Sequence, residues 1–221
     1  MLIVLKYFAL AFSALLPVVN PLGSSLVFLG LVGFVPSDVI SSLARRIAVT
    51  TTLFFLVIEL VGAALLQFFG ISLPVVQVAG GFVLAAMGWE LLHESDSTPL
   101  TRGSDVKVDG FRSLESKIFY PFTFPVTAGP GCIVVMLTLT AHATGTDLLG
   151  SLLAHVGIFL AVVVLSFSVF LCYRYAIRIT QKIAPETVHG ILRVIAFILL
   201  CIGVQIAWKG IETLVLSVRQ P

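Results

Sequence analysis

The sequence predicts an all-α membrane protein with six transmembrane helices arranged as an inverted three-plus-three repeat. The first observation behind this prediction is composition: of 221 residues, 58% are hydrophobic and 11% are charged, and the mean hydropathy is +1.11. Because a soluble domain has about 25% charged residues, we expect the lipid bilayer to surround most of the chain. The second observation is a motif rich in helix breakers that occurs twice within apolar runs, at residues 17–23 (PVVNPLG) and 125–131 (PVTAGPG).

The composition and the absence of short catalytic motifs exclude several classes of protein. A net charge of +2 is too small to indicate a nucleic-acid partner. The chain has no H-E-x-x-H, G-x-S-x-G or Walker motif, so we expect no enzyme. Its three cysteines lie in apolar stretches without the close Cys or His neighbours of a metal site. We therefore expect neither a metal nor a cofactor.

Six stretches are suited to cross the roughly 30 Å of bilayer hydrocarbon, which takes about 20 apolar residues. They are residues 4–33, 47–69, 75–92, 118–141, 150–173 and 188–208. The first stretch has 30 residues, about 45 Å of helix at 1.5 Å per residue, and its breakers lie at its centre. We predict that the first and fourth helices are each broken at the membrane midplane, as two half-helices joined by an unwound segment.

One long polar stretch separates two halves of similar layout. The halves are residues 1–94 and 118–221, and residues 95–117 form a cytoplasmic connector. A shift of 108 residues places Pro17 on Pro125 and Gly23 on Gly131. Three crossings in each half is an odd number, so the second half enters the membrane from the opposite side. This is the arrangement of many secondary transporters, whose sites lie near the midplane on discontinuous helices.

The charges predict the orientation of the chain. With six full crossings, nine Lys and Arg residues lie on one side and three on the other, so the positive-inside rule places both termini outside the cytoplasm. The nine are Arg45, Arg46, Arg102, Lys107, Arg112, Lys117, Arg174, Arg178 and Lys182, and the three are Lys6, Lys209 and Arg219. If the first and fourth elements were re-entrant hairpins, the count would again be nine to three, so charge alone leaves both topologies open.

The two motifs have the chemistry of a small-molecule site. Asparagine caps free N–H groups and proline suits the first helical position, so Asn20-Pro21 predicts a new half-helix, and Gly129-Pro130 predicts another. Two facing helix N-termini suit a carboxylate, while freed carbonyl groups and hydroxyls suit an ammonium group or Na⁺. The candidate binding residues are Asn20, Pro21, Gly23, Ser24, Ser25, Thr123, Thr127, Gly129 and Gly131. The alternative is that the prolines and glycines only kink these helices.

Ionisable residues within membrane spans are candidates for function. Glu59 lies near the centre of the second span and is the candidate for carrying a coupling proton, with a structural, hydrogen-bonded role as its alternative. We expect His155, near one end of the fifth span, to be an interfacial or packing residue. Gly81, Ala85 and Gly88 share one helical face, as do Gly203 and Ala207. We expect these small residues to let two helices pack closely.

At these residues the chain resembles the MarC family of six-span inner-membrane proteins, which contains the SnatA-type transporters of small neutral amino acids. The resemblance covers nearly the whole chain and depends on NPLG at residues 20–23, PxTAGPG at residues 125–131 and FxLAxxGxxL at residues 82–91. It implies an inverted three-plus-three fold, the prokaryotic inner membrane, and transport of glycine, alanine, serine or threonine. The two motifs differ, so they need not bind the same part of the ligand.

The sequence thus leads to a secondary transporter that works by alternating access, with a small amino acid as its ligand. Coupling to H⁺, coupling to Na⁺, and uncoupled export or exchange are all compatible with the sequence, as is a homo-oligomer. The alternative is a channel for water or small neutral solutes, since Asn-Pro starts on half-helices also occur in aquaporin-type pores. The second motif lacks the asparagine, which disfavours a channel. A third alternative is a scaffold with kinked helices.

Overall fold

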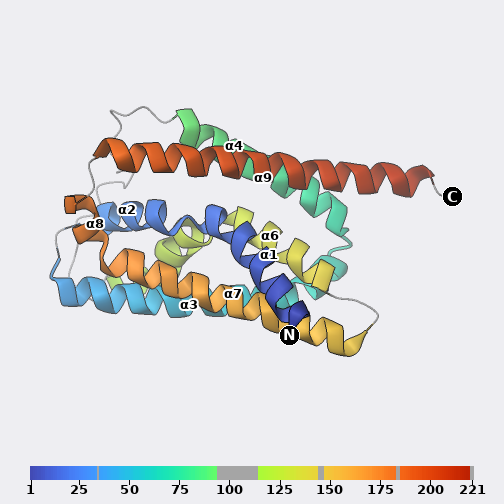
Figure 1. The fold of residues 1–221 in the computed structure, drawn as a ribbon, viewed down its shortest axis with the longest axis horizontal. Coiled ribbons are helices and arrows are strands. Elements are labelled where there is room, and N and C mark those ends of the chain that lie inside the picture. Colours follow the sequence, from blue (N-terminus) through green and yellow to red (C-terminus); the bar gives the residue numbers. More distant parts are fainter. Residues whose placement is uncertain (34, 94–113, 144–146, 183–184, 220–221) are drawn as a thin grey trace.

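The structure is a computed structural model that describes residues 1–33, 35–93, 114–143, 147–182 and 185–219. These residues form helices and no strand (Figure 1). The helices are α1 (Leu2–Val19), α2 (Pro21–Val32), α3 (Ser37–Phe68), α4 (Leu73–His93), η1 (Ile118–Thr127), α6 (Pro130–Ala143), α7 (Leu148–Arg174), α8 (Ala176–Lys182) and α9 (Pro185–Arg219). Most of the predicted connector, residues 95–117, lies outside the described residues.

Within the described part of the chain, five stretches are long and apolar enough to cross a membrane. They are Leu2–Val32, Ser37–Phe68, Leu73–His93, Leu148–Arg174 and Gly190–Ser217. If η1 and α6, which are bent by 70° at the break between them, are counted as one span, they give a sixth. The prediction of an all-helical membrane protein is confirmed, whereas its division into two inverted halves is taken up below as a proposal.

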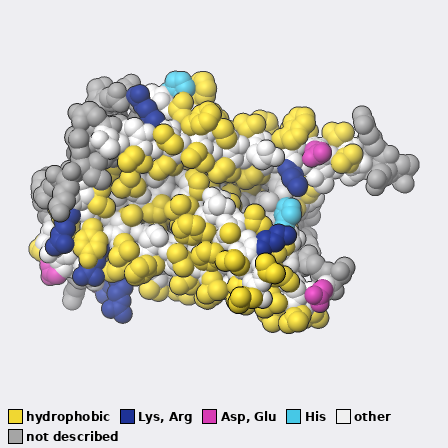
Figure 2. Space-filling model, viewed as in Figure 1, with side chains coloured by type: hydrophobic (Ala, Val, Ile, Leu, Met, Phe, Trp, Pro, Cys, Tyr) yellow, Lys and Arg dark blue, Asp and Glu magenta, His cyan; other side chains and the backbone are white. Residues whose placement is uncertain are grey.

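The surface suits a bilayer along the length of the helices. Large apolar side chains point outward from most of the long helices, for example Leu53, Val57 and Leu60 on α3. On the face seen in Figure 2, hydrophobic side chains cover the middle of the molecule, and Lys and Arg gather toward its ends. Apolar side chains along the middle of the helices and charged side chains at their ends are the pattern that a lipid bilayer requires.

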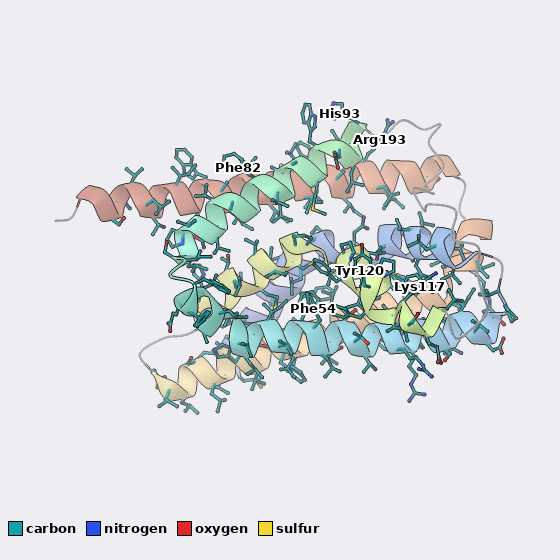
Figure 3. The ribbon with its side chains drawn as sticks, turned by 180° about the vertical axis from the view of Figure 1, so that it is seen from behind. Phe54, Phe82, His93, Lys117, Tyr120 and Arg193 are labelled. Atoms are coloured by element: carbon teal, nitrogen blue, oxygen red, sulfur yellow. The ribbon has the colours of Figure 1, made fainter. Side chains whose placement is uncertain are left out.

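The helices form one bundle and one attached pair. In the bundle, α3 and α7 lie side by side and run antiparallel, α1 and α2 pack on α7, and η1 and α6 pack on α3 (Figure 1). Figure 3, which shows the molecule from behind, places Phe54 of α3 against η1, where its ring lies 6.1 Å from that of Phe119 and 6.0 Å from that of Phe124. The pair is α4 with α9, which meets the bundle mainly through α6 and α1.

Small residues allow the backbones of α4 and α9 to touch. A Cβ atom on Gly81 would lie 2.6 Å from the carbonyl oxygen of Gly203, and a Cβ atom on Gly203 would lie 2.7 Å from that of Gly81. The same Cβ atoms would also meet backbone nitrogens, that of Ala207 for Gly81 and that of Ala85 for Gly203. The prediction that small residues let these helices pack closely is confirmed, since no larger side chain fits at either glycine.

Candidate functional site

The first motif interrupts helical hydrogen bonding at a single residue. Asn20 lies between α1 and α2 with φ 43° and ψ 68°, the left-handed region that Asn tolerates better than most residues. Its N–H donates to Leu16 O, which closes α1, and its Oδ1 accepts from Gly23 N at 3.1 Å. Pro21 follows at the first helical position. The predicted capping role of Asn20 is confirmed, and Leu2–Val32 continues as one span.

The second motif follows an irregular helix whose shape comes from its prolines. The residue before a proline is forced toward extended backbone, and Tyr120 (φ −122°, ψ 124°) and Phe124 (φ −118°, ψ 125°) have such angles within η1. The hydroxyls of Thr123 and Thr127 donate to the carbonyl oxygens five residues earlier, at 2.8 and 2.6 Å. Both threonines therefore satisfy carbonyls, Ile118 O and Phe122 O, that the sequence analysis expected to be free for a ligand.

Tyr173, at the end of α7, joins the two motifs. Its hydroxyl lies 2.7 Å from Thr127 Oγ1 in a buried contact, and Ser24 is a polar neighbour of the same hydroxyl. Because the Thr127 proton is directed to Phe122 O, Tyr173 donates and Thr127 accepts. A hydroxyl from a third element thus has a polar neighbour in each motif, Ser24 in the first and Thr127 in the second.

An aromatic cluster holds Tyr173 in place. The Tyr173 ring stacks on Phe28 of α2 with centroids 4.6 Å apart, and Phe28 meets Phe122 of η1 edge to face at 5.4 Å. All three side chains are almost completely buried. Tyr173 was missed by the sequence analysis, where it only ended a span, because nothing in the local pattern shows that it meets a threonine 46 residues away.

Ser24 and Ser25 are buried and hydrogen-bonded within α2. Ser24 Oγ donates to Asn20 O at 2.9 Å, and Ser25 Oγ donates to Leu22 O at 2.7 Å. Bonds of this kind back to an earlier carbonyl are common for serine in helices. In the described conformation the serine protons point to the backbone, so a ligand must exchange with these internal hydrogen bonds.

The glycines of the two motifs allow close contact with other helices. A Cβ atom on Gly23 would meet the Asn20 amide and lie 3.0 Å from Leu192 of α9. A Cβ atom on Gly131 would meet the Leu84 side chain of α4 and lie 3.4 Å from Val18 of α1. The two motifs are therefore adjacent, and each lies against a helix of the α4–α9 pair.

Glu59 is paired with a histidine. Its Oε1 lies 3.1 Å from Nδ1 of His155 on α7, and the side chains are 4% and 31% exposed. The sequence analysis expected His155 to be an interfacial or packing residue, and the structure adds that its ring nitrogen contacts the one carboxylate buried in the described core. Antiparallel packing of α3 on α7 brings together residues 96 positions apart.

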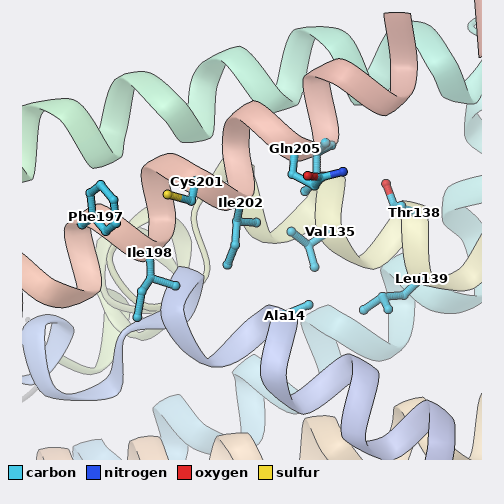
Figure 4. A pocket seen from close by; sticks show the side chains of 10 residues that line it. Ala14, Val135, Thr138, Leu139, Phe197, Ile198, Cys201, Ile202 and Gln205 are labelled. Carbon is cyan, nitrogen blue, oxygen red and sulfur yellow. The ribbon is translucent and has the colours of Figure 1, made fainter. Parts of the chain in front are cut away.

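A separate cavity of about 460 Å³ lies between α1, α6 and α9. Its lining is almost entirely apolar, with Thr138, Cys201 and Gln205 as its polar residues. Figure 4 shows the Gln205 amide on α9 directed toward Thr138 on α6. The cavity does not include residues of either motif, so we treat it as distinct from the site at Ser24, Thr127 and Tyr173.

Comparison with known proteins gives a consistent result. The sequence model for "MarC family integral membrane protein" matches residues 5–215. The chain is 26% identical over 213 residues to a UPF0056 membrane protein of Pyrococcus horikoshii, covering 96% of this chain and 98% of that relative. It is 29% identical over 212 residues to the UPF0056 inner membrane protein MarC of Citrobacter koseri, covering 93% and 94%. The corresponding protein of Escherichia coli is 28% identical over 218 residues, with 96% of each chain covered. No solved structure matches the chain.

Proposed function

Because the chain belongs to the MarC family of integral membrane proteins, we propose that it is a secondary transporter of small neutral amino acids, of the glycine, alanine, serine and threonine class. The substrate class is the one that the resemblance of its two motifs to the SnatA-type transporters implies. The observation that carries the proposal is the Tyr173 hydroxyl, which contacts Thr127 of the second motif and has Ser24 of the first motif as a polar neighbour. One buried point thereby collects polar groups from both motifs.

The packing supports an inverted repeat. If α1–α2, α3 and α4 correspond to η1–α6, α7 and α9, then α3 packs on its own counterpart α7, and α4 packs on its counterpart α9. The contact of α2 with α7 corresponds to that of α6 with α3. Gly131 and Gly23, which are equivalent in the repeat, each meet a leucine on the third span of the other half. Alternating access then requires one half to rock against the other.

A zwitterion fits the hydrogen bonds that the motifs already make. Ser24 and Thr127 each donate to a backbone carbonyl, Asn20 O and Phe122 O. An ammonium group can replace both hydroxyls at these carbonyls, because it has three protons to donate. The two released hydroxyls, together with the positive ends of α2 and α6, then suit the carboxylate. The ligand's hydrogen bonds replace those within the protein, so few buried polar groups are left without a partner.

The surroundings favour a small ligand. The rings of Phe28, Phe122 and Tyr173 form a buried wall on one side of Thr127 and Ser24. A branched or aromatic substrate side chain would have to displace one of these rings, whereas a hydrogen atom or a methyl group adds little volume. We therefore place the selectivity for small side chains at this aromatic wall.

The charges support an orientation with both termini outside the cytoplasm. Figure 1 shows α1 beginning and α9 ending toward the same end of the molecule. That end carries Lys6 and Lys209, while Arg45, Arg46, Lys117, Arg174 and Arg178 belong to the helix ends on the opposite side. The positive-inside rule makes the arginine-rich end cytoplasmic.

Exchange in proteoliposomes tests the proposal. The purified protein is expected to exchange internal alanine for external labelled alanine, with saturation, and to be inhibited by glycine and serine. Ser24→Ala and Thr127→Val are each expected to weaken apparent affinity by about tenfold, since each removes a ligand hydrogen bond worth ~1.4 kcal/mol. Ser168→Ala on α7 and Thr213→Val on α9, whose hydroxyls lie outside both motifs and donate to backbone carbonyls of their own helices, serve as matched controls that change exchange less than twofold.

Two other results would change the assignment. Solute flux that does not saturate and shows no counterflow would identify a channel instead. If no amino acid is exchanged by well-folded wild-type protein, and none raises its melting temperature, the transporter assignment is wrong.

A further inference from the structure

Glu59 and His155 form a polar pair within two apolar helices. The carboxylate is 4% exposed and contacts the imidazole at 3.1 Å. Glu59 lies nine residues before the end of α3, and His155 lies seven residues after the start of α7. At 1.5 Å per residue, both are about 10 to 14 Å from the helix ends, which is well inside the apolar belt. We propose that this pair is the proton-binding site that couples transport to a proton gradient, an inference that rests on the proposed function.

Stability alone does not account for such a pair. Bringing two ionisable groups out of water costs about as much as their attraction returns, and an apolar pair of similar size is often as stable or more stable. Ionisable residues within membrane spans accordingly mark proton relays and ion pathways. The pair is therefore better explained by a proton that binds and leaves than by packing.

The surroundings favour a proton over a metal cation. A hard cation such as Na⁺ needs several oxygen ligands, by analogy with the six or more that Ca²⁺ takes. Glu59 lies within α3, whose 32 residues are continuously helical, so nearby carbonyls already accept helical hydrogen bonds. Among the described residues, no group of three His, Cys, Asp or Glu side chains could hold a metal. A proton needs only the carboxylate and the imidazole.

The neighbouring elements supply no second carboxylate to this part of α3. From α6, Leu137 contacts Gly62, while the titratable residues of α6 are Cys132, which is buried, and His142, whose Nδ1 is hydrogen-bonded to Thr138 O. From η1, phenylalanines meet Phe54, and the titratable Tyr120 is exposed. The other titratable residues of α7 are Cys172, Tyr173 and Arg174, about 27 Å along the helix from His155. The titratable residues of α1, which packs on α7, are Lys6 and Tyr7; a Cβ atom on Gly157, two residues from His155, would lie 3.1 Å from Tyr7 Cβ, and the Tyr7 hydroxyl donates to His142 O.

The two ring nitrogens of His155 allow a proton to reach Glu59 in two steps. With His155 neutral and its Nδ1–H donating to the Glu59 carboxylate, a proton can bind to Nε2 of the ring. The Nδ1 proton then passes to Oε1 of Glu59, which leaves a neutral imidazole with its proton on Nε2 and a neutral carboxylic acid. The net change is one proton bound and one negative charge removed from the apolar interior. Histidine is suited to this shuttle because its two nitrogens exchange roles.

The position of the pair connects the proton to the transport cycle. Glu59 is on α3 and His155 is on α7, which are corresponding helices of the two proposed halves. Protonation removes a buried negative charge and so changes the free energy of the contact between α3 and α7. This change is different in a conformation where Glu59 and His155 are in contact and in one where they are apart. A proton can therefore bias the equilibrium between the two access states in proportion to that difference.

The test compares exchange with gradient-driven accumulation in the same proteoliposomes. For wild type with one proton per substrate, a pH difference of one unit is expected to support about tenfold accumulation, since each unit is a tenfold ratio at equilibrium. Glu59→Gln and His155→Gln are expected to keep alanine exchange but to lose accumulation, so that the internal to external ratio falls to about one. Glu90→Gln on α4 and His142→Gln on α6 are the matched controls and keep the wild-type ratio.

A direct measurement makes the result independent of how well the variants fold. Alanine added to wild-type proteoliposomes that contain a pH-sensitive dye is expected to change the internal pH. If wild type exchanges alanine but moves no protons, or if Glu59→Gln still accumulates alanine tenfold, the proton site is wrong while the transporter assignment stands. If wild type exchanges no amino acid, both are wrong.

Discussion

The hydrogen bond between Tyr173 and Thr127 gives the sharpest prediction about the site. The two oxygens are 2.7 Å apart, and the side chains are 0% and 1% exposed. A neutral hydrogen bond contributes about 0.5 to 1.5 kcal/mol, and cycles within membrane proteins average about 0.6 kcal/mol. We expect Tyr173→Phe to lower the free energy of unfolding by about 1 kcal/mol, because the ring still stacks on Phe28.

A double-mutant cycle with Thr127→Val isolates this bond from the rest. Thr127→Val also removes the hydrogen bond to Phe122 O, so we expect it to cost about 2 kcal/mol by itself. The double variant should be more stable than the sum of the single changes predicts, by about 0.6 to 1 kcal/mol, because the shared bond is lost only once.

The assay is reversible unfolding in mixed micelles with increasing fractions of denaturing detergent, followed by circular dichroism. Tyr7→Phe supplies the control, since the Tyr7 hydroxyl donates to His142 O at 2.8 Å, near the end of α6 that is remote from Thr127. Its effect should add to that of Thr127→Val. If the Tyr173 cycle is also additive within about 0.3 kcal/mol, the two hydroxyls are not energetically coupled and the link between the motifs fails as an argument for a shared site.

Three further predictions, with five substitutions between them, test the fold by the same unfolding measurement. Gly203→Ala places a methyl group against backbone and should lower the free energy of unfolding by about 1 to 3 kcal/mol. Gly190→Ala on the same helix meets nothing within 4 Å and should raise it by about 0.5 kcal/mol. Equal effects would contradict the close packing of α4 on α9. Asn20→Ala should cost about 1 to 2 kcal/mol and Asn20→Gly only a few tenths, because glycine tolerates the left-handed backbone; equal losses would show that the capping amide matters less than described. Arg46→Gln removes an exposed ion pair with Glu115 at 3.0 Å and should cost less than 1 kcal/mol, with the loss disappearing in high salt.

Local chemistry made part of this structure predictable. Asn20 followed by Pro21 favours a helix start, because asparagine caps free N–H groups and proline has a fixed φ, so the start of α2 could be predicted from two residues. The spacing of Gly81, Ala85 and Gly88 likewise predicted a close helix contact. Hydropathy placed the spans but not the helix ends, since α3 begins at Ser37, about nine turns before its end and ahead of the predicted span at residues 47–69.

The contacts between distant residues could not be read in the same way. Whether Thr127 meets Tyr173, or Glu59 meets His155, depends on which helices pack and at what rotation, and one sequence does not contain that information. The hydroxyls of Thr123 and Thr127 were predicted as ligands, but their bonds to Ile118 O and Phe122 O depend on the irregular turns of η1. The binding roles of all these residues remain predictions for the exchange experiments.

The glycine contact between α4 and α9 also affects how variation in this chain should be interpreted. At Gly81 and Gly203 even alanine collides with backbone atoms that cannot rotate away, so these positions tolerate almost no substitution. They lie outside both motifs, yet a mutational survey would rank them with residues that touch the substrate. In this fold, intolerance to substitution marks helix crossings as strongly as it marks a binding site. Only measurements that separate folding from transport distinguish the two.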